Sequence, residues 1–277
     1  MHLISIIIST YNWPSALELC LESFKAQHDK NFEIIIADDG SNPANLLKAQ
    51  TYCASINRPI NYSHHEDKGF RAGTIRNKAV AQSKGDYLIF IDGDCVVRPD
   101  FISKHRLLAE TGYFVPGNRV LLRPSYTKEI VDQHVFLHQK SLSDFFVLRL
   151  KNKINKISAF LSLPLGYLRY LQPNKWQKAM TCNLAIWKND FMKVNGFDEL
   201  FEGWGYEDSD LVIRLIHAGV KRKEGRFAVP VLHLWHPQND RSQHDLNYQR
   251  LMERLSQPDF VFAEKGMSQY PPLHVNN

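Results

Sequence analysis

The sequence has little of several features that mark particular protein classes. Its 277 residues include only four cysteines, and no two of them have CxxC spacing. Thirteen prolines and fourteen glycines are near the average, which excludes collagen-like and low-complexity chains. The longest apolar runs, Leu3–Ile8 and Tyr87–Ile91, fall far short of the ~20 residues of a membrane-spanning helix. These absences predict a globular protein, and the few cysteines favour the reducing cytosol.

Motifs of common nucleotide-binding classes are also missing. Neither GxGxxG nor GxxxxGK[ST] occurs, which disfavours dinucleotide redox chemistry and P-loop chemistry. Residues 1–8 carry no basic leader and no cleavage site, so we expect a first strand there and not a signal peptide. With 44% hydrophobic and 23% charged residues, the chain can bury the core of one large domain or two small ones.

Positive charge is concentrated in one segment. The whole chain has a net charge of +5, yet residues 141–178 contain seven Lys or Arg residues and a single acid, Asp144. Large apolar residues such as Phe146 and Leu150 alternate with these cations. Such a segment is typical of a membrane-surface or anionic-partner element. The alternative is a buried helix pair with a solvated basic rim.

The first 120 residues alternate between strand-like and helix-like stretches. β-Branched and apolar runs predict the strands Leu3–Ile8, Glu33–Ala37, Ile60–Ser63 and Tyr87–Ile91, and apolar periodicity predicts the helices Pro14–Ala26 and Ala72–Ser83. This order predicts an α/β fold with a mostly parallel central sheet and flanking helices. Polar clusters follow the strands, so we expect them to meet at the carboxyl edge of the sheet, where ligands bind in such folds.

A second block begins near Ala179. It predicts the strands Ala179–Trp187 and Ala228–Leu234, the helix Lys188–Val194, a helix ending near Gly219, and a helical stretch through Leu255. We therefore divide the chain into a nucleotide-binding half (1–120), a basic and apolar insert (121–178), an acceptor or catalytic half (179–240) and a C-terminal helical tail (241–277).

Asp92-Gly93-Asp94 places two carboxylates on a turn directly after an apolar strand. Carboxylate oxygens are hard ligands that suit Mg²⁺ or Mn²⁺ bound together with substrate phosphates. The glycine between them lets a ligand approach the backbone closely. A phosphohydrolase with an aspartate nucleophile would also have Asp-x-Asp after a strand, but usually near the start of its domain.

His233 and His236 form a His-x-x-His pair at the end of a predicted strand. Two histidines beside a tryptophan are usually packing residues when they occur alone. Because the chain also has the carboxylates of Asp92-Gly93-Asp94, we interpret the pair as the second half of a metal site.

Two further clusters suit a nucleotide. Asp38 and Asp39 end a strand before Gly40, where an Asx turn is expected; one carboxylate would also be free to accept the imide N–H of uracil. Lys68, Arg71 and Arg76 surround a glycine-rich helix start, where arginine and backbone amides suit a pyrophosphate. A solvated helix face would explain these cations equally well.

The stretch from Gly203 to Asp210 is the most specific segment. Two glycines flank Trp204, whose indole face would stack on a sugar ring. Glu207, Asp208 and Asp210 place three acids within four residues, and crowded carboxylates raise one another's pKa. One of them would act as a general base toward a hydroxyl group. We expect Asp210 to have a structural role at the start of the helix and Asp208 to take part in the reaction.

Together these motifs resemble the inverting glycosyltransferases of family 2, which have the GT-A fold, with an acceptor half similar to β-1,4-galactosyltransferases. The resemblance covers most of residues 3–240. It depends on the order of Ser9-Thr10-Tyr11-Asn12, Ala37-Asp38-Asp39-Gly40-Ser41, Arg76-Asn77, Asp92-Gly93-Asp94, Asn195-Gly196-Phe197-Asp198-Glu199, Gly203-Trp204-Gly205-Tyr206-Glu207-Asp208 and His233-Leu234-Trp235-His236. Tyr206, in place of a usual glycine, and the long basic insert depart from the pattern.

The resemblance implies a role for each matched residue. In the donor site, Thr10 and Asp39 would line the nucleoside pocket, with Asp39 in contact with uracil. Arg76 would hold the diphosphate, and Asp92 would face the ribose or the sugar. Asp94 and His236 would bind Mn²⁺ or Mg²⁺; His233, which stands where the family has a thioether, is either a further ligand or a departure. Trp204 and Glu207 would contact sugars, and Asp208 would be the catalytic base.

The sequence thus predicts transfer of a hexose or N-acetylhexosamine from a UDP-sugar to a hydroxyl of a cell-surface glycan or lipid-linked acceptor, as in lipopolysaccharide or capsule synthesis. We expect a cytoplasmic protein, peripheral on the inner face of an anionic membrane, with no nucleic acid partner. The alternatives are the phosphohydrolase and a non-catalytic nucleotide-sugar-binding protein.

Overall fold

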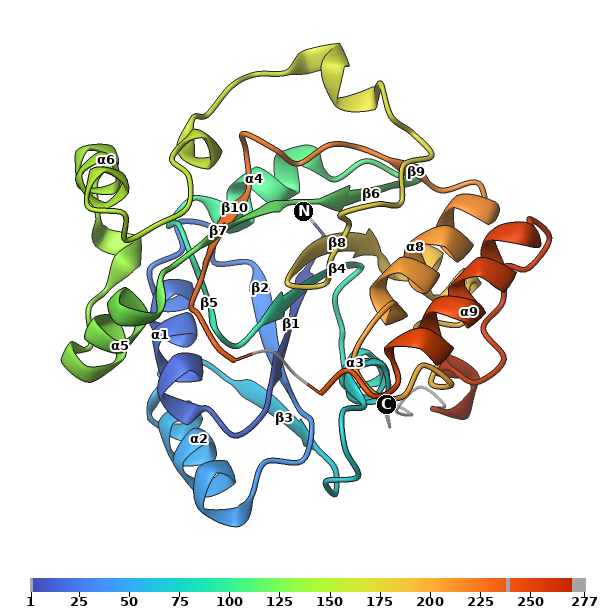
Figure 1. Ribbon diagram of the computed structural model, residues 1–277, viewed down its shortest axis with the longest axis horizontal. Helices are drawn as coiled ribbons and strands as arrows, with labels where there is room; N and C mark the ends of the chain where they lie inside the picture. The colour runs from blue at the N-terminus through green and yellow to red at the C-terminus, as the bar shows by residue number, and fades with distance from the viewer. Residues whose placement is uncertain (1, 238–239, 271–277) are drawn as a thin grey trace.

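The computed structural model describes residues 2–237 and 240–270, and its centre is a seven-stranded sheet (Figure 1). The strand order is β3-β2-β1-β4-β8-β6-β9. The strands are β1 (Ile4–Thr10), β2 (Phe32–Asp38), β3 (Ile60–His64), β4 (Tyr87–Asp92), β6 (Tyr113–Pro116), β8 (Asn183–Trp187) and β9 (Lys221–Arg222). Strands β3, β2, β1 and β4 are parallel to one another, and β8 is antiparallel to both its neighbours. The predicted α/β fold with a mostly parallel sheet is confirmed.

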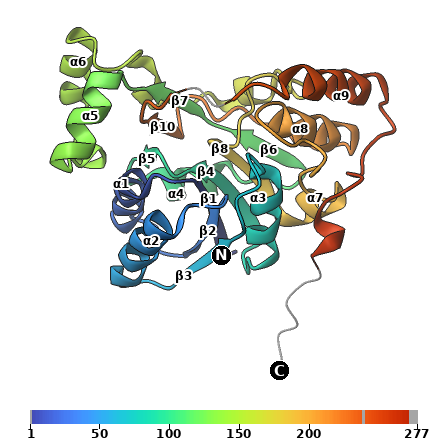
Figure 2. The same ribbon diagram turned by 60° about the horizontal axis from the view of Figure 1, so that its bottom comes forward.

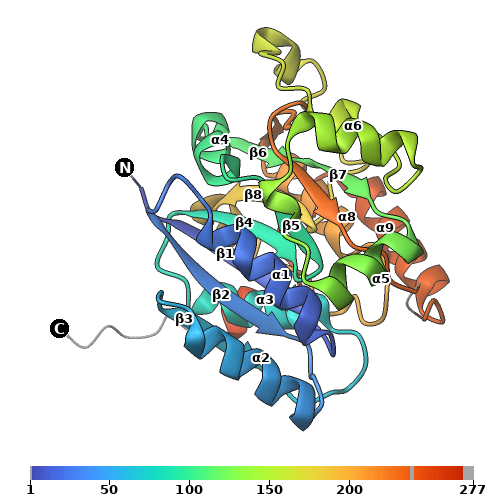
Figure 3. The same cartoon turned by 90° about the vertical axis from the view of Figure 1, so that its left-hand side faces the viewer.

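Helices cover both faces of this sheet. On one face, α1 (Pro14–Lys25), α2 (Pro43–Ser55) and α4 (Phe101–Leu108) pack against the side chains of Ile4, Ile6 and Ile8. On the other, α3 (Ala72–Ala81), α7 (Lys188–Lys193) and α8 (Glu207–His217) pack against Ile7 and Ile35. Figure 3 shows α1 and α2 in front of the sheet and α3 behind it. Alternate residues of β1 thus enter opposite cores, which is why the strand is apolar almost throughout.

A smaller three-stranded sheet closes one end of the large one. Its order is β5 (Cys95–Val97), β10 (Pro230–His233), β7 (Asn118–Leu121), with β10 antiparallel to β5 and parallel to β7. The pairing opposes His233 to Cys95, so it brings the end of β10 beside the Asp92-Gly93-Asp94 turn. A contact between segments almost 140 residues apart in the chain therefore depends on this second sheet.

The remaining helices lie at opposite ends of the molecule. Figure 2 shows α5 (Pro124–Gln133) and α6 (Leu142–Leu150) at one end, and α8 and α9 (His244–Ser256) at the other. None of the helices in the described ranges combines the length and the hydropathy that crossing a bilayer requires. All four cysteines are buried and unpaired.

Two local predictions differ from the structure. The strand expected over 179–187 begins only at Asn183, because residues 181–182 form a turn directly before it. The helix pair considered for 141–178 is wrong: within this fully described segment only α6 is an α-helix, followed by the short 3-10 turns Ser158–Phe160 and Gly166–Tyr170. Phe145 and Leu148 of α6 are buried against the small sheet, whereas its other apolar side chains face outward.

Candidate active site

A cleft of about 680 Å³ opens at the carboxyl ends of the parallel strands. Its volume lies in the range of small-molecule sites in proteins. The predicted residues that line it are Thr10, Asp39, Arg76, Asp92, Asp94, Trp204, Glu207, Asp208, His233 and His236. The structure therefore brings every predicted site residue to one cavity, although the role of each remains a prediction.

Strand β1 and the turn after β4 form the floor of the cleft. Ser9 and Asp92 are paired across β1 and β4, and the Ser9 hydroxyl donates to Asp92 Oδ1 over 3.0 Å. The Gly93 N–H donates to the Ser9 carbonyl at 2.7 Å. A Cβ at Gly93 would lie 3.2 Å from Thr10 Cβ and 3.1 Å from the Ser9 carbonyl oxygen, so a side chain there would press on the strand.

Arg76 lies at the centre of one carboxylate group. This side chain is buried, and its guanidinium lies 3.1 Å from Asp92 Oδ1, 3.4 Å from Glu207 Oε1 and 3.8 Å from Asp208 Oδ1. Buried carboxylates are stable only when opposite charge or hydrogen bonds compensate them. Arg76 was predicted to contact the donor diphosphate. In the structure its guanidinium lies beside three acids of the cleft and partly compensates their negative charge.

The acids opposite Arg76 titrate abnormally. Burial raises the pKa of Glu207 to about 8, and the adjacent Asp208 acts in the same direction while Arg76 opposes it. Burial also raises the pKa of Asp208, opposed by Arg76 and by hydrogen bonds from Thr181. The Thr181 hydroxyl donates to Asp208 Oδ1 at 2.7 Å and its N–H to Oδ2 at 3.0 Å. Sequence reasoning missed Thr181, which belongs to no motif and reaches Asp208 only through the turn before β8.

Asp94 lies in a second group. One carboxylate oxygen is 3.6 Å from His233 Nε2 and the other is 3.5 Å from His236 Nε2. Burial raises the pKa of Asp94, and the two histidines act against this shift. Cys95 is also buried, and its sulfur lies near Asp94 and His233.

These donors suit a divalent cation. A carboxylate between two imidazoles offers the oxygen and nitrogen ligands that Mn²⁺ accepts, and the buried Asp94 charge lacks a full counter-charge of its own. Both histidines donate from Nδ1 to a nearby backbone carbonyl, which orients the rings. The residues present therefore fit a metal.

Asp38 and Asp39 were each considered for an Asx turn and for a contact to the nucleobase, and the structure places the two residues differently. Asp38 accepts from the N–H groups of Gly40 and Ser41 and forms the expected Asx turn. Asp39 instead borders the cleft, where its Oδ1 is 2.7 Å from His65 Nε2 and its Oδ2 accepts from the Arg71 N–H at 2.9 Å. His65 was given no role from sequence, since only the folded chain places it against Asp39.

The glycine-flanked tryptophan lies at the rim. Gly203, Gly205 and Tyr206 have φ values of 73°, 119° and 70°, a left-handed region that glycine adopts at little cost. These turns present Trp204, which stacks on His244 and lies under the Arg241 guanidinium at 4.7 Å. Asp210, by contrast, is fully buried and paired with Arg214 at 2.6 Å, so the prediction of a structural role is consistent with its contacts.

Family models match most of the chain. The model of glycosyl transferase family 2 matches residues 5–162, and that of the N-terminal domain of galactosyltransferase matches residues 168–236. The fold and cleft define a GT-A protein. The chain belongs to glycosyl transferase family 2, which confirms the resemblance inferred from its motifs and favours a transferase over a phosphohydrolase.

Individual relatives are distant. Validoxylamine A glucosyltransferase of Streptomyces hygroscopicus is 28% identical over 79% of this chain and 52% of its own length. Chondroitin synthase of Pasteurella multocida is 27% identical over 78% of this chain and 23% of its own. The chain thus spans about half the length, or less, of these curated relatives.

Solved structures share the fold. TarS of S. aureus (residues 1–349) superposes with a TM-score of 0.58 at 14% identity, covering 97% of this chain and 68% of that one. The mannosyltransferase PcManGT of Pyrobaculum calidifontis, solved with GDP-Man and Mn²⁺, gives 0.57 at 15% identity, covering 93% and 63%. At such identity the likeness concerns the fold alone.

Proposed function

We propose that this chain is a metal-dependent, inverting glycosyltransferase that moves a hexose or N-acetylhexosamine from a UDP-sugar to an acceptor hydroxyl. The observation that carries the proposal is the pair of carboxylate groups on one cleft floor. One group holds a candidate base, Asp208, beside Arg76, and the other holds Asp94 between two imidazoles. Family membership supports the transfer reaction.

Asp39 is the proposed contact for the nucleobase. Each of its oxygens already accepts one hydrogen bond, and a carboxylate oxygen has room for a second. An imide N–H of uracil would supply it. Tyr11, half exposed at the cleft and hydrogen-bonded to Asp67, offers a ring face to the base, and Thr10 lies beside it.

Asp94, His236 and His233 are the proposed ligands of Mn²⁺ or Mg²⁺. When bound, such an ion neutralises the negative charge that develops on the departing nucleoside diphosphate. Asp92, held by Ser9 and Arg76, would then face the ribose or the transferred sugar.

Asp208 is the proposed general base. It accepts the proton of the acceptor hydroxyl as that oxygen forms a bond to the anomeric carbon. The bond from this carbon to the diphosphate oxygen breaks on the opposite face, and its electron pair leaves with UDP. The two hydrogen bonds from Thr181 fix the carboxylate, and one displacement inverts the anomeric centre. Trp204 and Glu207 are the proposed sugar contacts.

Nucleotide release from purified protein tests the proposal. We expect UDP to form from one UDP-sugar in the presence of Mn²⁺ and an acceptor sugar, and chelation with EDTA to stop it. GDP-mannose belongs in the panel because guanine also presents a ring N–H to a carboxylate. Preferred release of GDP would overturn the uracil assignment. Tight UDP binding without turnover on any donor would favour the non-catalytic alternative.

We further propose a cell-surface glycan or glycolipid acceptor, as in lipopolysaccharide or capsule synthesis, and peripheral attachment to an anionic bilayer. Support comes from α6, where Leu142, Phe146, Val147 and Leu150 are 44–71% exposed beside the basic residues Arg149 and Lys151. Apolar side chains with flanking cations are typical of interfacial helices, and each cation near anionic lipid contributes ~1 kcal/mol.

Flotation with vesicles tests the membrane contact. We expect the protein to float with phosphatidylglycerol vesicles and the double variant Phe146→Asp/Leu150→Asp to remain at the bottom. Leu107 on α4 is 82% exposed, so Leu107→Asp is a matched control that should float like the parent protein. Equal flotation of all three would contradict the assignment of α6.

A further inference from the structure

Four cations lie near one another beside the catalytic cleft, and one of them, Arg119, lines it. Burial lowers the pKa of the Lys156 ammonium, and the charges of Arg119, Arg226 and Lys178 lower it further. Within the described residues, Arg119, Lys156 and Lys178 have no ion pair and no side-chain hydrogen bond, whereas Arg226 pairs with Glu224 at 3.5 Å. We refer to these four residues as the basic wall.

The backbone explains why such distant residues meet. The Asn155 N–H donates to the Leu121 carbonyl at 3.0 Å, so the segment before Lys156 runs along β7, the strand that carries Arg119. The Leu163 N–H donates to the Phe227 carbonyl, which brings the loop of Arg226 alongside. The wall is thus a product of the insert folding back on the small sheet.

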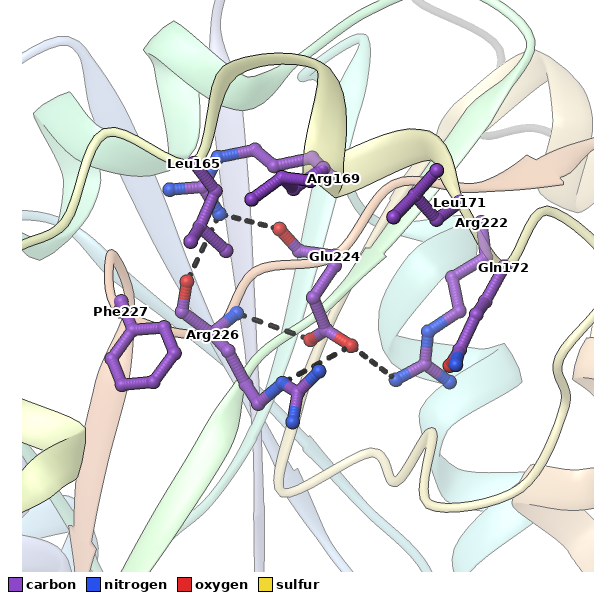
Figure 4. Close-up of a pocket in the computed structure, with 9 residues that line it drawn as sticks. Leu165, Arg169, Leu171, Gln172, Arg222, Glu224, Arg226 and Phe227 are labelled. Atoms are coloured by element: carbon purple, nitrogen blue, oxygen red, sulfur yellow. Dashed lines mark hydrogen bonds and ion pairs between the residues drawn. The ribbon is translucent and has the colours of Figure 1, made fainter.

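The basic wall contributes one residue to each of two cavities. Arg119 lines the catalytic cleft together with Thr181 and Asp208. At the other end Arg226 lines a separate pocket of about 240 Å³. Figure 4 shows Glu224 in this pocket between the guanidiniums of Arg222 and Arg226, with Arg169 above it. Two arginines thus flank one carboxylate, and Arg169 donates to the backbone carbonyls of Glu224 and Arg226. With three arginines and one acid in its lining, the pocket keeps an excess of positive charge.

Three neighbouring cations without a counter-charge require an explanation, because like charges held together destabilise the folded chain. A flat bilayer would meet the exposed side chains of α6, whereas Arg119 lies in the cleft that Asp208 also lines. An elongated polyanion, in contrast, would enter the cleft with one end at Asp208 and lie along the cations.

We propose that the basic wall binds an anionic acceptor, a glycan that carries phosphate or carboxylate groups, and leads it from the Arg226 pocket to Asp208. This inference rests on the proposed transferase function and names the acceptor class for that site. Arg119, Lys156, Lys178 and Arg226 would contact the anionic groups of the acceptor chain behind the hydroxyl that reacts. Neutral glycans of the same length would lack these contacts.

Fluorescence anisotropy with three labelled probes tests the proposal. The probes are hexagalacturonate for carboxylates, a six-unit poly(glycerol phosphate) for phosphates, and neutral maltohexaose. We expect one or both anionic probes to bind, with affinity that falls as salt rises, and maltohexaose to bind at least about 10-fold more weakly, which corresponds to ~1.4 kcal/mol. Whichever anionic probe binds more tightly identifies the charged group.

Charge reversal locates the site. Lys156→Glu/Lys178→Glu should weaken the anionic probe at least about 10-fold, again ~1.4 kcal/mol. Lys48→Glu/Lys84→Glu reverses two exposed cations elsewhere and should bind like the parent protein. Equal binding of all probes, or no loss in the first variant, would overturn the proposal. The proposal would also be overturned if Lys156→Glu/Lys178→Glu lost vesicle flotation but kept its affinity for the anionic probes, because the wall would then contact lipid.

Calorimetry with UDP and Mn²⁺ separates this inference from the proposed function. Parent protein and both double variants should bind UDP equally, since the wall lies on the acceptor side. Absence of UDP binding in the parent protein would contradict the proposed function without affecting the polyanion result. Retained UDP binding with no affinity for any anionic probe would overturn the acceptor class alone.

Discussion

Asp92 and Asp94 stand two residues apart on one turn, yet the protein treats their charges in opposite ways. Asp92 has a permanent partner, because the buried Arg76 guanidinium lies 3.1 Å away. Asp94 faces two imidazoles, at 3.5 and 3.6 Å, and the Cys95 thiol, and burial raises its pKa. The first carboxylate is balanced by an arginine of the chain, whereas the second has no lysine or arginine partner among the described residues and is the proposed metal ligand.

This difference corresponds to the two roles proposed for the cleft, a general base at Asp208 and a metal site at Asp94. Arg76 lies beside Asp92, Glu207 and Asp208 and supplies a positive charge to all three. The Asp94 group combines one carboxylate with two imidazoles, a set of ligands that suits a divalent ion bound together with the donor diphosphate. The comparison makes four predictions, described from the largest expected effect to the smallest.

The largest effect should follow from removing the base in the group balanced by Arg76. Asp208→Asn should lower turnover by about 10²–10⁴, since general-base catalysis contributes that much. UDP affinity in Mn²⁺ should stay unchanged, because Asp94 is intact. Single-turnover kinetics and calorimetry measure the two quantities, and the exposed Asp245→Asn is the control. Full turnover in Asp208→Asn would refute the base assignment.

In the other group, Asp94→Ala should remove metal-dependent donor binding. Changing only an outer partner of a metal ligand costs about 10–100-fold in affinity, so loss of the central carboxylate should cost at least ~100-fold. His236→Ala should show a smaller loss, and His233→Ala decides whether that residue is a ligand. The readout is UDP affinity with Mn²⁺ and with EDTA. An affinity in Mn²⁺ equal to that of the parent protein would exclude Asp94 as a ligand.

Removing the built-in cation should destabilise the whole fold. Arg76→Met leaves one buried and two partly buried carboxylates without their counter-charge, and breaking a buried ion pair typically costs about 3–5 kcal/mol. Arg76→Lys keeps the charge and should lose less. Urea denaturation at pH 7.5 gives the free energy of unfolding. A loss below ~1 kcal/mol in Arg76→Met would indicate that water, not Arg76, compensates these acids.

His105 extends the comparison, because this buried imidazole has no ion pair within the described residues and its hydrogen-bond partner is the neutral Asn183. Burial lowers its pKa to about 3, while a hydrogen bond with Asn183 acts the other way. The unfolded chain takes up a proton below about pH 6.5 and the folded chain does not. Stability attributable to His105 is therefore full above pH 6.5 and falls by ~1.4 kcal/mol per unit as the pH drops toward 3.

His105→Gln should lack this component. Between pH 6.5 and 5 we expect the parent protein to lose about 2 kcal/mol more than the variant, measured by urea denaturation at each pH. The exposed His28→Gln serves as control and should follow the parent curve. Parallel curves for all three proteins would mean that His105 is protonated in the folded state.

The sequence predicted strands and motifs better than the contacts between them. Strands β1, β2 and β4 are apolar runs ended by polar clusters, a pattern that is local and therefore readable. Short elements such as β5 and β7 have only three or four residues and were not predicted, because so short a run carries no periodicity. Thr181, His65 and Arg119 were missed for a related reason: none has a motif of its own.

The amino-acid sequence by itself determined the fold class, the family and the set of acids and histidines around the cleft, because these follow from local patterns and their order. Only the tertiary structure decided which partner each charge has. In the folded chain Asp38 forms the Asx turn, whereas Asp39 borders the cleft. Arg76 lies among three acids, and Lys156 lies near Arg119. Such pairings join segments far apart in the chain, and their energies depend on burial and distance, which no linear pattern contains.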